Sequence, residues 1–189
     1  MSDATTDRDG KLMEMLVGYA ASHQHPFNVA VHLIGIPIIM LGVCIPLTWL
    51  ELQLPGVTLN GAHLLLAAFF LFYLSLDAAF AFVFLFAGLL IVELAARLGG
   101  YSLGVSGGIA AAAFFGGYLL QFIGHAVEKS MPVLVKHPIQ ANIAAPFFTV
   151  VEVFGLLGLR RALFDEVNRQ VEHRREVEAS GALPSAAAQ

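Results

Sequence analysis

Long apolar runs constrain the fold of this chain more than any other feature of its sequence. Four such runs, each near 20 residues or longer, cover residues 27–50, 63–98, 109–127 and 139–159. A helix of about 20 apolar residues is long enough to cross the roughly 30 Å hydrocarbon core of a bilayer. Hydrophobic residues make up 58% of the 189 positions and charged residues 13%, against about 45–50% and about 25% in soluble domains. The sequence therefore predicts an all-α, polytopic membrane helix bundle.

Charge and cysteine content exclude several classes of protein. The net charge is −4 and no basic stripe is present, so nucleic acid is not an expected partner. The single cysteine, Cys44, lies inside an apolar run, which argues against a disulfide framework or a thiolate metal cluster. The first nine residues are polar and acidic, so we expect no signal peptide. Oligomeric state is left open.

The run at 63–98 decides the number of membrane crossings. A single helix over 64–94 would be about 46 Å long, well beyond the hydrocarbon core, and would bury Asp77 near its middle. Two spans, about 61–74 and 78–96, would instead place Asp77 in a tight turn at the water interface.

The distribution of Lys and Arg favours two spans in this region. Arg8 and Lys11 precede the first apolar run, seven basic residues follow from Lys129 onward, and Arg97 alone lies between. Positive residues mark cytoplasmic segments, so both ends of the chain are predicted to be cytoplasmic, which requires an even number of crossings. We therefore predict four transmembrane helices, with an interfacial or re-entrant segment after them.

These arguments divide the chain into four regions. Residues 1–26 form a cytoplasmic segment with an amphipathic helix, and residues 27–128 form the four-span membrane domain. Basic residues flank the apolar run at 139–159 on both sides, so we expect 129–163 to dip into the membrane or lie on it. Residues 164–189 form a charged cytoplasmic helix and a disordered tail. The membrane is the inner membrane in a bacterium and the endoplasmic reticulum in a eukaryote.

Histidines gather at the start of the first predicted span. His23, His25 and His32 are three of the seven histidines in the chain. Pro26 suits the first turn of a helix, where its missing N–H is no loss, so the helix is expected to begin near His25 or Pro26. Neutral imidazole is a common ligand of iron, zinc and copper. This segment is interpreted as half of a metal site, the alternative being an interfacial anchor or a hydrogen-bonding helper.

A second polar group lies about a hundred residues later. Gln121, His125 and Glu128 are four and three residues apart, so they share one face of a helix. Four crossings would bring this face to the same side of the membrane as the first histidines. Histidines with a nearby carboxylate are typical of non-haem iron oxygenases. The alternative is an ordinary polar seam that satisfies groups at helix ends.

At these residues the chain resembles the membrane-bound, iron-dependent 2-hydroxy fatty acid dioxygenases of yeast and their bacterial relatives. The similarity covers about residues 12–160. It rests on Tyr19, Ser22-His23-Gln24, Pro26, Asn28, His32, Gly35 and Pro37, then Tyr73-Leu74, Leu76-Asp77, Gln121 to His125, Glu128-Lys129, Pro132, Pro146-Phe147-Phe148 and Glu152.

The resemblance implies an activity and a set of site residues. The activity is α-oxidation, in which Fe(II) and O₂ shorten a 2-hydroxy fatty acid by one carbon. The implied metal ligands are His23, His32 and His125. Further functional residues are expected at Asn28, Gln121, Glu128 and Lys129, with Lys129 placed to neutralise the substrate carboxylate. The expected partners are a fatty acid and O₂ within a membrane.

Two other classes of protein stay open at this point. A histidine-ligated lipid hydroxylase or desaturase would use similar residues but would need more ligands, for two metals. A non-enzymatic membrane scaffold or carrier would explain the apolar helices without a metal.

Overall fold

The computed structural model describes residues 10, 12–20, 25–129, 133–136 and 138–180. The chain divides into two compact units: His25–Glu152, and Met1–Gln24 with Val153–Gln189. The first unit holds nearly all residues of the long apolar helices.

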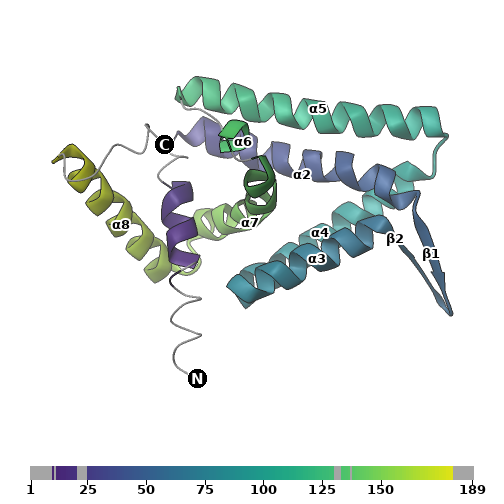
Figure 1. Cartoon of the computed structure of the whole chain (residues 1–189), viewed down its shortest axis with the longest axis horizontal. Helices are drawn as coiled ribbons and strands as arrows, with labels where there is room; N and C mark the ends of the chain where they lie inside the picture. Colours follow the sequence, from purple (N-terminus) through teal and green to yellow (C-terminus); the bar gives the residue numbers. More distant parts are fainter. Residues whose placement is uncertain (1–9, 11, 21–24, 130–132, 137, 181–189) are drawn as a thin grey trace. The chain divides into compact units, whose positions relative to one another are not determined.

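Helix α2 (Pro26–Thr48) and helix α5 (Leu103–Glu128) run side by side in opposite directions (Figure 1). Helix α2 begins where the sequence predicts, with Pro26 at its first position and the His25 side chain accepting a hydrogen bond from the backbone N–H of Phe27. The start of α2 and the end of α5 therefore meet at one end of this helix pair.

Small residues let the backbones of α2 and α5 approach closely. A Cβ added to Gly117 would lie 2.9 Å from the carbonyl oxygen of Gly35, and one added to Gly42 would lie 2.6 Å from the backbone nitrogen of Phe114. Real Cβ atoms do not come so near to backbone atoms. Such close contacts are typical of helices that pack through small residues in membranes. We call this line of contacts the small-residue seam.

The apolar run at 63–98 forms two helices, as predicted. Helix α3 (Gly61–Leu76) ends and helix α4 (Ala78–Gly99) begins at Asp77, which is extended. The Asp77 carboxylate caps α4 by accepting a hydrogen bond from the backbone N–H of Phe80, at 3.1 Å. The single long helix is therefore not formed, and Asp77 lies in the turn that the charge argument required.

A β-hairpin joins α2 to α3. Its strands, β1 (Glu51–Leu54) and β2 (Val57–Asn60), pair antiparallel around Pro55 and Gly56. The sequence predicts a turn at these two residues, and Gly56 has the positive φ of 82° that such turns favour. The strands themselves were not predicted.

Helix α7 (Pro138–Leu156) follows the short helix α6 (Val133–Lys136). Within the first unit, α7 contacts both helix pairs. The Tyr73 hydroxyl of α3 donates a hydrogen bond to the carbonyl of Ile143, at 2.6 Å, and the Tyr118 hydroxyl of α5 donates to the Asn142 side chain. Aromatic rings fill the space between α7 and the α3–α4 pair. Their centroids lie 4.7–5.6 Å apart across Tyr73, Phe80, Phe84 and Phe147.

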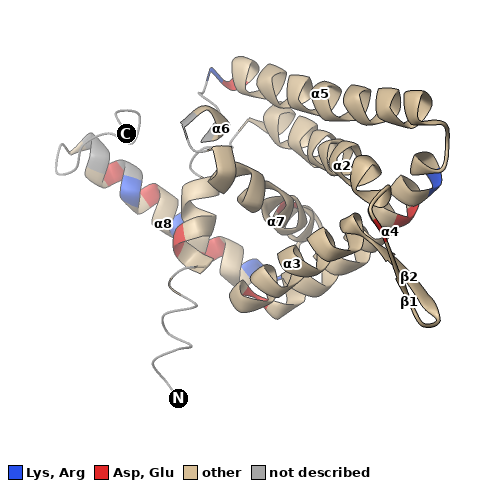
Figure 2. Ribbon diagram, turned by 45° about the vertical axis from the view of Figure 1, so that its right-hand side comes forward, with Lys and Arg blue, Asp and Glu red and all other residues tan. Residues whose placement is uncertain are grey.

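In the part of the chain that the structure describes, four helices are long and apolar enough to cross a membrane: α2, α4, α5 and α7. Charged residues are sparse along them and dense along α8 (Figure 2). These findings confirm a polytopic membrane helix bundle. These four helices are not the four predicted spans. Helix α3 has 16 residues and is shorter than the other candidate spans, whereas α7 has 19 residues and is long enough to cross. Placement of both termini in the cytoplasm stays a prediction.

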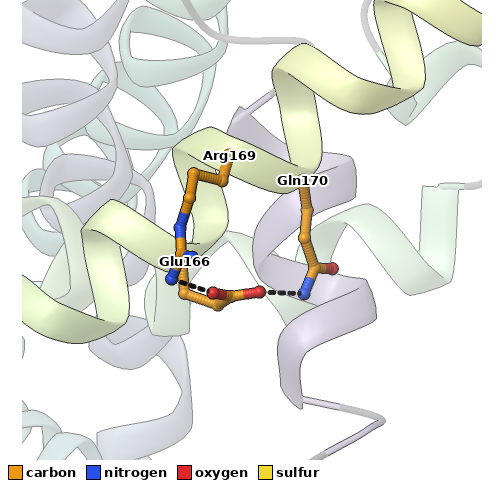
Figure 3. Close-up of polar contacts among 3 residues, drawn as sticks. All are labelled: Glu166, Arg169 and Gln170. Atoms are coloured by element: carbon orange, nitrogen blue, oxygen red, sulfur yellow. Dashed lines mark hydrogen bonds and ion pairs between the residues drawn. The ribbon is translucent and has the colours of Figure 1, made fainter.

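The second unit holds a helix at residues 12–20 and helix α8 (Arg161–Ala179). Leu12, Leu16 and Val17 are buried, as are Val167 and Val171. On α8 the Glu166 carboxylate accepts hydrogen bonds from Arg169 and, at 2.8 Å, from Gln170 (Figure 3). Helix α8 is the charged helix that the sequence predicts, and it begins three residues earlier.

Candidate metal centre

Two of the three histidines proposed as ligands lie together. His32, in the second turn of α2, and His125, in the last turn of α5, have ring centroids 5.0 Å apart with the planes nearly perpendicular. Both side chains are buried, with 7% and 5% of their surface exposed. The antiparallel packing of α2 on α5 brings these residues together across 93 positions of sequence.

A backbone hydrogen bond fixes the tautomer of His32. Its Nδ1 lies 2.9 Å from the carbonyl oxygen of Asn28. Because a carbonyl oxygen only accepts, Nδ1 carries the proton and Nε2 keeps the lone pair. Metal-binding histidines usually donate from their second nitrogen to a carbonyl or carboxylate in this way. His32 is thus held in the form that binds a metal through Nε2.

Glu128 closes the same end of the helix pair. Its Oε1 accepts a hydrogen bond from the backbone N–H of His25, at 3.1 Å, and its Oε2 accepts one from the Asn28 side-chain amide. A carboxylate is stabilised at a helix N-terminus by unpaired N–H groups and the helix dipole. The carboxylate therefore bridges the last turn of α5 to the first turn of α2. We call these contacts the Glu128 clamp.

Asn28 is wholly buried within this arrangement. Its Nδ2 donates to Glu128, whereas its Oδ1 is the buried side-chain oxygen that has no hydrogen-bond partner among the described residues. Gly124 leaves the space that Asn28 occupies, because a Cβ at that position would overlap the Asn28 side chain and lie 2.5 Å from Cγ2 of Val31. Burying an unpaired amide oxygen costs about 1–3 kcal/mol, a penalty that the hydrogen bond from Nδ2 to Glu128 offsets in part.

Gln121 lies one turn before His125 and faces α2. Its Nε2 donates to the carbonyl oxygen of Val31 at 3.4 Å. A Cβ on Gly35 would overlap this amide group. Gln121 therefore packs in the small-residue seam beside the histidine pair, and its hydrogen bond holds α5 against α2 at this point.

The other candidate residues lie outside the histidine pair. Lys129 is exposed and ends α5 in a left-handed conformation, with φ of 57°. His25 caps α2 through its Nδ1, and Asp77 caps α4. Glu152 lies on α7 and is partly buried. His23 falls outside the described residues.

The described residues supply two nitrogen donors of the kind that a metal such as Fe(II) would need, and not a complete ligand set. Two buried imidazoles at contact distance are suitable nitrogen donors for iron. In the described part of the chain, no three His, Cys, Asp or Glu side chains form a group that could hold a metal ion. Both Glu128 oxygens accept hydrogen bonds from α2, so this carboxylate serves the helix end. A third protein ligand would have to come from elsewhere, and His23 precedes the start of α2 by only three residues.

Fold and site together define a class of protein: a polytopic helical membrane protein with a buried pair of imidazoles at one end of its helices. The chain belongs to the Mpo1-like family, described as 2-hydroxy-palmitic acid dioxygenase Mpo1-like, which matches residues 10–157. This confirms the family resemblance predicted from the sequence motifs.

A curated relative gives a similar result. The chain is 27% identical to the 2-hydroxy-palmitic acid dioxygenase MPO1 of Saccharomyces cerevisiae over 162 residues, which cover 85% of this chain and 90% of the yeast protein. No solved structure matches the chain significantly.

Proposed function

We propose that this protein is an Fe(II)- and O₂-dependent dioxygenase that shortens a long-chain 2-hydroxy fatty acid, such as 2-hydroxypalmitic acid, by one carbon. The observation that carries the proposal is the buried pair of His32 and His125 in a chain of the Mpo1-like family. The similarity to the yeast enzyme supplies the substrate class. The reaction occurs at the membrane, where such acids dissolve.

The proposed reaction balances without an added reductant. The bond between C1 and C2 breaks, C2 becomes the new carboxyl carbon, and C1 leaves as CO₂. One O₂ takes up the four electrons released and the products are the shorter acid, CO₂ and water. Fe(II), when bound, supplies the redox centre that allows O₂ to react.

The residues of the chain have separate roles in this proposal. His32 and His125 hold the metal, with His23 as the third ligand. The Asn28 carbonyl keeps the His32 ring in its binding tautomer. Glu128 clamps the helix ends and so sets the separation of the two histidines. Lys129, exposed beside this end of α5, attracts the substrate carboxylate. Positioning of this kind can contribute about 7–11 kcal/mol to a reaction.

The test compares two substrates of equal length. Purified protein loaded with Fe(II) is incubated under air with 2-hydroxypalmitic acid or palmitic acid, and the products are separated by mass. The proposal expects the acid one carbon shorter from the first substrate, with CO₂ released in equal amount, and no product from the second. Shortening of both acids, or hydroxylation of palmitic acid, would favour a lipid hydroxylase instead.

A further inference from the structure

An apolar groove lies between α2 and α5, toward the opposite end of this helix pair from the histidines. Its volume is about 410 Å³, and it is shallow and largely open. This volume lies within the roughly 300–1,000 Å³ of small-molecule sites. Its lining includes Gly42, Val43 and Pro46 of α2 and Ala110, Ala111 and Phe114 of α5. No polar side chain lines it, so the groove suits a hydrocarbon chain.

The groove is aligned with the histidine pair on both helices. Val43 follows His32 by eleven residues, and Phe114 precedes His125 by eleven. Eleven residues make about three turns, which return a side chain to within about 20° of the same face and about 16 Å along the axis. Tyr118 lies between Phe114 and His125, with its ring 4.9 Å from that of Phe114. One flank of the helix pair therefore carries the histidines at one end and the groove at the other.

We propose that this groove binds the hydrocarbon tail of the fatty acid whose carboxyl end lies at the histidine pair. The inference rests on the proposed function and adds a second subsite to it. A long acid lying along the helix pair reaches the groove with its tail, whereas a short acid ends before it. The groove thus selects acids by chain length, and by binding the tail it holds the carboxyl end at the histidine pair.

The fluorescence of Trp49, at the far end of the groove, can report whether a ligand occupies it. Trp49 is the single tryptophan, and its Cη2 lies 3.9 Å from the Cβ position of Gly107, about one turn before Ala111 on α5. Bromine quenches indole fluorescence at short range. An ω-brominated 2-hydroxypalmitic acid with its tail in the groove therefore brings bromine close to Trp49.

The groove is tested with two matched variants. Ala111 lines it and is exposed, so Ala111→Phe fills the groove with little strain on α2. Ala112 is also exposed and does not line the groove, so Ala112→Phe makes the same change beside it. We expect saturable quenching of Trp49 by the ω-brominated acid in the unchanged protein and in Ala112→Phe. In Ala111→Phe the apparent affinity falls by about 10-fold or more, the size expected when bulk is added to a packed apolar contact.

Activity gives the second readout. Ala111→Phe should raise the KM for 2-hydroxypalmitic acid and leave that for 2-hydroxyoctanoic acid unchanged. Shortening of both acids with equal efficiency in Ala111→Phe, together with unchanged quenching, overturns the groove and leaves the proposed function intact. Saturable quenching that Ala111→Phe removes, without oxidation of any acid, supports the groove and overturns the proposed function. Quenching that only rises linearly with added acid means that bulk lipid fills the groove, and it overturns the subsite.

Discussion

Replacing Glu128 by Ala tests whether this carboxylate clamps the helices or binds the metal. The change removes the acceptor of the Asn28 amide and of the His25 N–H. Asn28 is fully buried and its Oδ1 already has no partner among the described residues, so its amide would be left unsatisfied at both atoms. An unsatisfied buried group costs about 1–3 kcal/mol, and losing a carboxylate at a helix N-terminus costs about 0.3–1 kcal/mol. We expect Glu128→Ala to lower the free energy of unfolding by about 1–4 kcal/mol.

The assay measures unfolding and iron content on the same samples. Unfolding is followed by titrating SDS into detergent micelles, and iron is measured at low and saturating Fe(II). Glu93→Ala is the control, because Glu93 forms an exposed i,i+4 ion pair with Arg97 at 2.9 Å and such pairs contribute about 0.3–0.5 kcal/mol.

Two results would refute the assignment of Glu128 to the clamp. The first is a loss of stability no larger than that of Glu93→Ala. The second is an iron content at saturating Fe(II) as low as that of a histidine variant, which would make Glu128 a ligand. The clamp predicts that full iron binding is restored at saturation, with affinity about 10–100-fold weaker, as is typical when a group that orients a ligand is lost.

Three further predictions follow from the helix contacts. His125→Ala should abolish iron binding at any Fe(II) concentration while the circular dichroism spectrum stays helical; full iron and activity would exclude it as a ligand. Gly117→Ala should lower stability by about 1–3 kcal/mol because its Cβ would meet a carbonyl of α2 at 2.9 Å, whereas Gly116→Ala, with nothing within 4 Å, should be neutral or stabilising in the same SDS titration. In intact cells a membrane-impermeant maleimide should label Gly104→Cys and not Ser75→Cys; the reverse pattern would contradict cytoplasmic termini.

Local features of the fold were readable from the sequence because their causes are local. Asp77 breaks the apolar run since an aspartate buried mid-membrane is costly and caps a helix well. Pro26 fixes the start of α2 because proline suits the first position of a helix, where its missing N–H is no loss. The β-hairpin was missed because four-residue strands carry too little pattern to separate them from a loop. Flanking basic residues led to the expectation that the run at 139–159 dips into the membrane or lies on it, whereas α7 is long and apolar enough to cross it.

The sequence predicted which residues form the candidate site but not the contacts between them. His32 and His125 were predicted to meet because four crossings return both to one face. The hydrogen bond from His32 to the Asn28 carbonyl, and the bonds from Glu128 to the start of α2, depend on how each helix is rotated about its axis. Residue spacing alone does not give this rotation. For this reason Glu128 was predicted only as a further functional residue, and its hydrogen bond to a helix start 103 residues away was not foreseen. The place of His23 stays a prediction.

The small residues of the seam repeat every seven positions, so they alone do not fix how far α2 is shifted along α5. Asn28, Gly35 and Gly42 are seven residues apart, and so are Ala110, Gly117 and Gly124. Sliding α2 along α5 by seven residues, about 10 Å, would again set small residues opposite one another. That slide would also carry His32 about 10 Å away from His125. The Glu128 clamp breaks the degeneracy, because its carboxylate meets the start of α2 in one of these registers alone, and that register is the one that pairs the histidines.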